Sequence, residues 1–216
     1  MSAAATLAEL RAQIRALEGG ARVVRRRAPS GVPVVDDLLG GLPRPGIVEI
    51  SGVPGSGRVR LVASLLARAT EQRRAVAWVD PERRLYPPAL AAHGVEVSRL
   101  LVVRPPSDGS HPWLWATEQL LRSGCFELVV VEPPTARGPG GRRAVARRPI
   151  GPRWARAAEH GQSTALVLGE RPTRQLAADV RLAVGAGQVA VVRDRGGPAG
   201  GQGPLPAWPE HVGPFA

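Results

Sequence analysis

A glycine-rich stretch that follows an apolar run constrains the fold of this chain more than any other feature. The run covers residues 47–50 and is apolar except for Glu49, and an amphipathic helix is expected from Arg58 onward. Between them lie small or rigid residues: Gly52, Pro54, Gly55, Ser56 and Gly57. Glycines at such a turn let backbone N–H groups approach phosphate oxygens, and a helix N-terminus favours an anion. The spacing follows the phosphate-binding loop G-x-x-x-x-G-K-[ST] from Gly52, so we expect a strand, a phosphate-binding loop and a helix.

Two positions of this loop differ from what nucleotide hydrolysis requires. Arg58 occupies the lysine position and Val59 the hydroxyl position. In an active NTPase the ammonium group contacts the β- and γ-phosphates and the hydroxyl binds Mg²⁺. Valine has no ligand for Mg²⁺, and a planar guanidinium is not equivalent to an ammonium. We therefore expect a structural loop with no cofactor. Weak binding of ATP with Mg²⁺ is the first alternative, and ATP hydrolysis is the second.

All 29 cationic residues are arginine, so no lysine elsewhere in the chain can replace the missing one.

Two further acids could belong to the same site. Glu132 follows the apolar run 128–131, where an active ATPase usually carries Asp, and two prolines stiffen the chain after it. Glu82 follows the apolar run 75–79 and could orient a water for attack. A solvated loop acid is the alternative interpretation of Glu82. We expect no catalytic residue, with Glu82 as a vestigial candidate.

Apolar runs alternate with helical periodicity along the middle of the chain, which predicts an α/β fold with a mostly parallel central sheet. Two runs, 180–184 and 188–193, flank Gly185-Ala186-Gly187 and predict a C-terminal hairpin. We divide the chain into an N-terminal helix and basic linker (1–31), a core (32–195) and a Gly/Pro-rich tail (196–216). Eleven of the 21 tail residues are Gly or Pro, so we expect the tail to be disordered.

The net charge of +11 predicts an anionic partner, with nucleic acid as the first candidate. Seven arginines and no acid lie between residues 137 and 156, which suits phosphate contact. The residues expected to contact DNA are Arg137, Arg142, Arg143, Arg147, Arg148, Arg153 and Trp154, the last by stacking on a base. A solvated basic loop with Trp154 in the core is the alternative. Trp113 and Trp115 cannot both face inward on one helix, so one of them should be exposed.

Candidate partner-binding residues lie near both ends of the sequence. An amphipathic helix over residues 6–17 places four apolar side chains on one face, namely Leu7, Leu10, Ile14 and Leu17. This face either packs on its own domain or docks on a partner. Trp208 and Phe215 in the tail are candidate anchors of a short binding motif.

Other classes of site and location are not expected. The chain has one cysteine, Cys125, and four histidines without ligand spacing, so we expect no metal site. No apolar run approaches 18 residues and the first residues lack a signal-peptide pattern, so we expect no membrane partner and a cytoplasmic location.

Three segments resemble the ATPase core of the RecA recombinase. They are residues 41–52 around the glycine loop, residues 77–82 and residues 121–132. The resemblance covers roughly residues 32–195. It implies that Glu82 matches the catalytic glutamate of that family. It also implies that the arginine-rich segment corresponds to the first DNA-binding loop.

A short RecA-like chain with Arg58, Val59 and Glu132 in place of Lys, Thr and Asp is most similar to the ImuA family. That resemblance implies an adaptor in the SOS response and error-prone translesion synthesis, associated with the nucleoid. It implies three partners: an ImuB-like adaptor, RecA and an error-prone replicative-type polymerase. Single-stranded DNA is a further candidate. A weak DNA-stimulated ATPase and a stand-alone nucleic-acid-binding module remain the alternatives.

Overall fold

The computed structural model describes residues 26–106, 111–134, 150–173 and 176–207, and every structural statement below concerns these residues.

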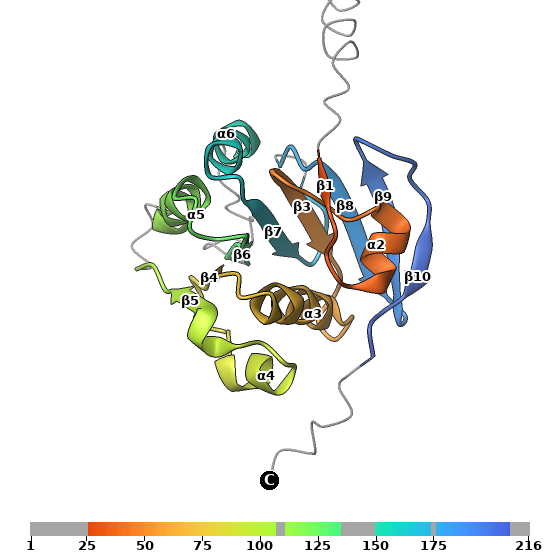
Figure 1. Cartoon of the computed structure of the whole chain (residues 1–216), viewed down its shortest axis with the longest axis horizontal. Coiled ribbons are helices and arrows are strands. Elements are labelled where there is room, and N and C mark those ends of the chain that lie inside the picture. The colour runs from red at the N-terminus through yellow and green to blue at the C-terminus, as the bar shows by residue number, and fades with distance from the viewer. Residues whose placement is uncertain (1–25, 107–110, 135–149, 174–175, 208–216) are drawn as a thin grey trace, which may run out of the picture.

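An eight-stranded sheet forms the centre of the molecule (Figure 1). Its strands lie in the order β10, β9, β8, β3, β7, β6, β4, β5. The six strands from β8 to β5 are parallel, whereas β9 and β10 are antiparallel to their neighbours. The predicted α/β fold with a mostly parallel sheet is therefore confirmed. The strand bounds are β3 (Gly46–Ser51), β4 (Val76–Val79), β5 (Leu100–Val103), β6 (Leu128–Val131), β7 (Thr164–Gly169), β8 (Val180–Gly185), β9 (Gln188–Asp194) and β10 (Gln202–Pro204).

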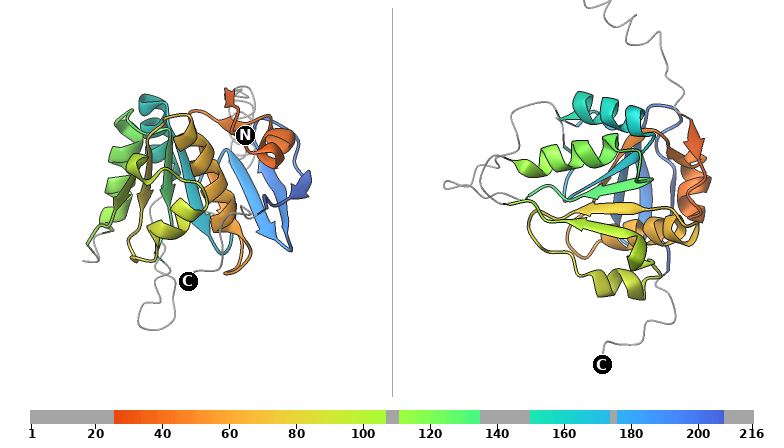
Figure 2. Two further views of the ribbon diagram at one scale, coloured as in Figure 1. Left: turned by 60° about the horizontal axis from the view of Figure 1, so that its bottom comes forward. Right: turned by 60° about the vertical axis from the view of Figure 1, so that its left-hand side comes forward.

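Helices cover both faces of the sheet, which gives three layers (Figure 2). One face carries α2 (Pro33–Leu39), α3 (Arg58–Glu71) and α4 (Pro87–Ala92). The other face carries α5 (Pro112–Arg122) and α6 (Gly151–Gly161). A 3₁₀ turn (Val97–Arg99) precedes β5, and the short strands β1 (Arg27–Ala28) and β2 (Leu42–Pro43) pair with each other.

Successive side chains along a strand point alternately into the two core layers on either side of the sheet. Val48 and Ile50 of β3 belong to the core beneath α3, and Ile47 belongs to the core beneath α5 and α6. All three side chains are fully buried. Strands buried on both faces have near-continuous apolar sequences, and the Leu-Val-Val-Val sequence of β6 is an example.

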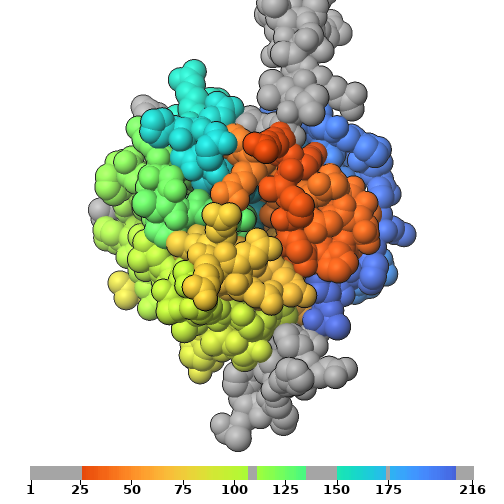
Figure 3. Space-filling model, viewed as in Figure 1, coloured from red at the N-terminus to blue at the C-terminus, as the bar shows by residue number. Residues whose placement is uncertain are grey.

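The C-terminal hairpin is confirmed, and the expectation of a wholly disordered tail is wrong. At the turn between β8 and β9, Ala186 and Gly187 have φ angles of 48° and 73°, as a tight hairpin turn requires. Strand β10 then pairs antiparallel with β9. A Cβ on Gly203 would lie 2.7 Å from Val34 Cγ2, so the glycine permits close packing of β10 on α2. Backbone pairing and this close approach order the segment without large side chains. Figure 3 shows orange α2 beside the blue strands.

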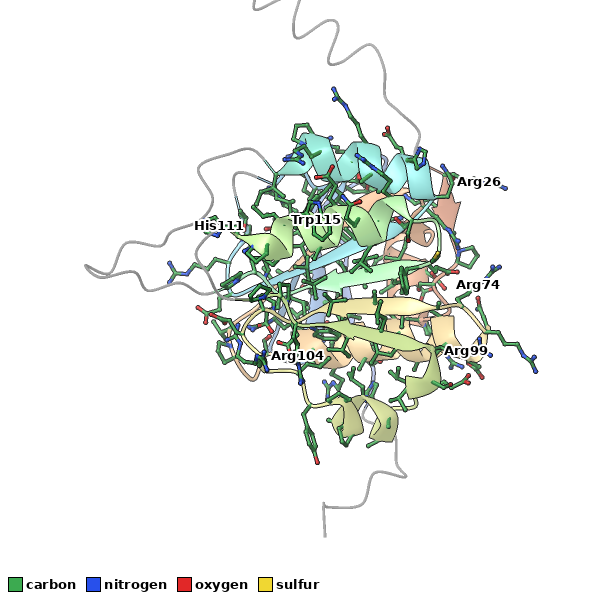
Figure 4. All side chains as sticks on the ribbon, turned by 90° about the vertical axis from the view of Figure 1, so that its left-hand side faces the viewer. Arg26, Arg74, Arg99, Arg104, His111 and Trp115 are labelled. Atoms are coloured by element: carbon green, nitrogen blue, oxygen red, sulfur yellow. The ribbon has the colours of Figure 1, made fainter. Side chains whose placement is uncertain are left out.

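Trp154 is a core residue, so its predicted role in base stacking is wrong and the alternative holds. Its side chain is 2% exposed, and its ring packs edge-on against Trp113 with the centroids 6.0 Å apart. The Trp154 indole N–H donates to the Leu114 carbonyl at 3.3 Å. Trp115 is 64% exposed on α5 (Figure 4), which confirms that Trp113 and Trp115 face in opposite directions.

We predict that Trp154→Ala lowers the free energy of unfolding by about 3–5 kcal/mol, because it leaves a cavity between α5 and α6. Trp115→Ala is the matched control and should change it by no more than about 0.5 kcal/mol. Urea denaturation followed by circular dichroism measures both values. Equal effects of the two substitutions would contradict the assignment of Trp154 to the core.

Candidate functional site

The glycine loop lies at the carboxyl end of β3, beside the carboxyl ends of β7 and β6. The Gly52 N–H donates to Gly169 O at 3.0 Å, which fixes the loop to β7. A Cβ on Gly52 would lie 2.4 Å from Ser56 Oγ and 2.5 Å from Val184 O, so only glycine fits there. Gly57 has a φ of 93° and directly precedes α3. The predicted strand, loop and helix are therefore all present.

Arg58, at the lysine position, is bonded within the protein. Its Nη2 lies 2.9 Å from Glu132 Oε1, and its Nη1 donates to Gly52 O. The two charged side chains are only 11% and 17% exposed. The structure thus brings together Gly52, Arg58 and Glu132 from the predicted nucleotide site. The ion pair joins Arg58, which follows the glycine loop, to Glu132, which follows β6, and the intervening strand is β7.

Arg84 extends this ion pair toward Glu82. Arg84 Nη2 lies 2.6 Å from Glu82 Oε2 and 3.4 Å from Glu132 Oε1. Glu82, Arg84, Glu132 and Arg58 therefore form a continuous row of alternating charges, which we call the ion-pair row. Glu82 is close to the predicted site, but it contacts an arginine that sequence reasoning did not select. No motif distinguishes Arg84 among 29 arginines.

Asp80, at the end of β4, positions the segment that carries Glu82 and Arg84. Its carboxylate accepts the backbone N–H groups of Arg84 at 2.8 Å and Leu85 at 3.2 Å. Arg104 Nε lies 3.3 Å from the same carboxylate. Sequence reasoning missed this role, although an acid directly after an apolar strand was a usable signal.

The remaining loop residues keep the shape of a phosphate site without its metal ligand. Val59 is 41% exposed at the hydroxyl position and offers no oxygen. Pro54, Gly55 and Ser56 line a cavity beside the loop. Within the described ranges, no group of three or more His, Cys, Asp or Glu side chains could hold a metal ion. Across the same ranges, no helix is long and apolar enough to span a membrane.

The other predicted site residues lie mostly outside the described residues. Arg153 is the exception: its side chain is largely exposed at the start of α6, and its Nη2 lies 2.7 Å from Glu118 Oε2. The predictions that fall outside are Arg137, Arg142, Arg143, Arg147, Arg148, Leu7, Leu10, Ile14, Leu17, Trp208 and Phe215.

A glycine loop after one parallel strand and an acid after another, within this sheet order, define a RecA-like P-loop core. The RecA N-terminal domain model matches residues 22–142, and the chain belongs to this family. Protein RecA of Symbiobacterium thermophilum is 38% identical over 110 residues, and Protein RecA of Picosynechococcus sp. is 35% identical over 109 residues. Each match covers 50% of this chain and 31% of the relative. The chain therefore spans about a third of the length of these relatives.

The fold is similar to that in the crystal structure of the RadB recombinase. The TM-score is 0.59 at 20% identity, over 80% of this chain and 92% of the RadB chain.

We predict that Arg58 and Glu132 stabilise the fold through each other. A double-mutant cycle with Arg58→Met and Glu132→Met should give a coupling energy of about 1–3 kcal/mol in urea denaturation, since each single change strands a mostly buried charge. The exposed pair Arg68 and Glu71 is the matched control and should couple by no more than about 0.5 kcal/mol. Additive effects at Arg58 and Glu132 would contradict the ion-pair row.

Proposed function

We propose that this chain is a non-catalytic RecA-fold adaptor in damage-induced, error-prone DNA synthesis. The observation that carries the proposal is the ion pair between Arg58 and Glu132. Phosphates of ATP would have to draw Arg58 away from both Glu132 and Gly52 O, and no hydroxyl at residue 59 would then hold Mg²⁺. The loop therefore serves as a structural link between β3 and β6.

The proposed partners are RecA, an ImuB-like adaptor and an error-prone replicative-type polymerase. Membership of the RecA family supports contact with a related fold, because closely related cores can assemble through similar surfaces. The apolar face of residues 6–17 offers a helix that could dock in a groove of such a partner. The resemblance to ImuA carries the assignment to mutagenesis.

Contact with single-stranded DNA is part of the same proposal. The net charge of +11 and the arginines between 137 and 156 support it, since phosphate contacts dominate affinity for nucleic acid. A stand-alone nucleic-acid-binding module would use the same arginines without any protein partner. The adaptor and the stand-alone module differ in one respect: the module's affinity for DNA would not depend on RecA.

A weak DNA-stimulated ATPase is the second candidate. Family membership and the position of Glu82 favour it, because Arg84 Nη2 lies close to both Glu82 and Glu132 and so brings the two acids near each other. Hydrolysis by this route would require the ion-pair row to open and free both acids.

The adaptor proposal predicts no Mg²⁺-dependent ATP hydrolysis, with or without single-stranded DNA. Phosphate release should equal that of Glu82→Ala, with purified RecA as the positive control in the same assay. The combined change Arg58→Lys, Val59→Thr and Glu132→Asp restores the missing ligands and should create Mg²⁺-dependent ATP binding measurable by calorimetry. Hydrolysis by the natural chain that Glu82→Ala removes would overturn the proposal in favour of the ATPase.

We also predict that Leu10→Asp with Ile14→Asp reduces co-purification with RecA at least about 10-fold, because charges at the centre of an apolar docking face are costly to bury. Ala12→Asp with Ala16→Asp places the same charges on the opposite helical face and should leave co-purification unchanged. Unchanged binding by the first variant would exclude this face as the docking site.

A further inference from the structure

The amino ends of the parallel strands gather arginines from several elements. Arg44 precedes β3, Arg74 precedes β4 and Arg99 precedes β5, and parallel pairing places these positions at one edge of the sheet. Figure 4 shows Arg26, Arg74 and Arg99 along this edge. We call the residues Arg26, Arg44, Arg73, Arg74 and Arg99 the amino-edge surface. This surface lies at the opposite end of the strands from the glycine loop.

One carboxylate joins two of these arginines. Glu127 precedes β6, and its Oε2 lies 2.8 Å from Arg44 Nη1 and 3.3 Å from Arg74 Nε. The side chain of Glu127 is 17% exposed, whereas that of Arg74 is 59% exposed. The Arg44 N–H donates to Arg26 O at 2.9 Å, which places Arg26 next to this cluster. The surface therefore holds a carboxylate between two guanidiniums and still presents much of one guanidinium to solvent.

The 3₁₀ turn before β5 connects the remaining arginines of the surface. Arg99 Nη1 donates to Arg73 O at 3.1 Å, and Arg99 Nε lies 2.9 Å from Glu96 Oε2. Hydrogen bonds from the Ser98 hydroxyl and then from Arg99 lower the pKa of Glu96, and the charge of Arg73 also contributes. Glu96 is therefore ionised at pH 7 and lies in the positive potential of both arginines.

The acids at this edge do not balance its arginines. Five guanidiniums share Glu96 and Glu127, which leaves three positive charges. Glu71, at the end of α3, pairs with Arg68 instead. The helices α3, α5 and α6 end at this edge, and each C-terminus adds roughly half a negative charge. About half of the positive surplus therefore remains, and such a surface attracts an anionic partner.

The groups on this surface suit carboxylates better than nucleic-acid bases. A guanidinium matches a carboxylate with two donors, and Glu127 shows that a carboxylate fits between Arg44 and Arg74. Unpaired bases are usually held by stacking on aromatic side chains. The exposed aromatic side chains of the described residues lie elsewhere: Tyr86 follows the carboxyl end of β4, and Trp115 lies on α5 away from this edge (Figure 4).

We propose that the amino-edge surface binds an acidic segment of a partner protein, in which several Asp or Glu residues lie close together in sequence. Their carboxylates would contact the exposed side chains of Arg26, Arg73 and Arg74. Binding at the amino ends of the strands would leave the ion-pair row intact, because that row lies at their carboxyl ends. The proposal goes beyond the adaptor role, and it stands whether or not the chain binds DNA or RecA.

The test is fluorescence anisotropy of rhodamine-labelled octaglutamate with the full chain, with a labelled Gly-Ser peptide of equal length and labelled oligo(dT) as comparison probes. Octaglutamate should bind with an affinity that falls as the salt concentration rises, and the neutral peptide should not bind. Arg73→Gln with Arg74→Gln should weaken octaglutamate binding about 10-fold, because two charge-assisted contacts are lost.

Arg83→Gln with Arg171→Gln is the matched control. It removes the same charge from two exposed arginines near the carboxyl ends of the strands, and it should change the affinity for octaglutamate by less than about 2-fold. Arg73→Lys with Arg74→Lys keeps both charges and should retain the affinity within about 3-fold. Urea denaturation midpoints show whether each variant is folded. Should Arg73→Gln with Arg74→Gln unfold, Arg26→Gln with Arg74→Gln replaces it, and the same loss of affinity is expected.

Two results would overturn the proposal. One is octaglutamate binding that survives Arg73→Gln with Arg74→Gln, or that the control pair weakens equally, since net charge alone would then explain it. The other is a loss of oligo(dT) binding in the same variant that exceeds its loss of octaglutamate binding. That result would assign the amino-edge surface to nucleic acid instead of an acidic protein segment.

Discussion

The ion pair between Arg58 and Glu132 joins the two strands on which the site depends. Arg58 begins α3 after β3, Glu132 follows β6, and β7 lies between those strands. The contact is possible because all three strands are parallel and end at the same edge of the sheet. Arg84 then links Glu132 to Glu82, and Asp80 holds Arg84 through its backbone N–H. The ion-pair row therefore lies where P-loop proteins usually bind a nucleotide and a metal ion, and its charged side chains pair with one another.

Much of this arrangement could be predicted from the sequence, because its determinants are local. The glycine loop, the strands β3 and β6 and the exposure of one of the two residues Trp113 and Trp115 follow from spacing and periodicity alone. Strand β10 could not be predicted that way, because pairing with β9 and close packing of Gly203 on Val34 are long-range effects. The burial of Trp154 likewise depends on Trp113, which lies on another helix. Arg84 was missed because its partners meet only after the sheet forms.

The described part of the tail affects the site as well as the sheet. Leu205 follows β10, its N–H donates to Gly187 O at 2.8 Å, and its side chain is buried. Leu205 Cδ2 occupies the position that a Cβ on Gly57 would take, with the two only 2.2 Å apart. Gly57 is therefore required twice, by its backbone angle and by this contact. Leu205 therefore packs on the glycine loop at Gly57, and Arg58 fixes the same loop through Glu132 and Gly52 O.

The distribution of acids around α3 gives the two sides of the loop different properties. On the inner side Glu132 and Glu82 neutralise Arg58 and Arg84, and Asp80 neutralises Arg104. On the outer side, no acid among the described residues lines the cavity beside the loop, which both Arg58 and Arg60 line. Without a lysine at residue 58 or a hydroxyl at residue 59, the loop is held by contacts of Arg58 within the protein rather than by the groups that would bind phosphates and a metal.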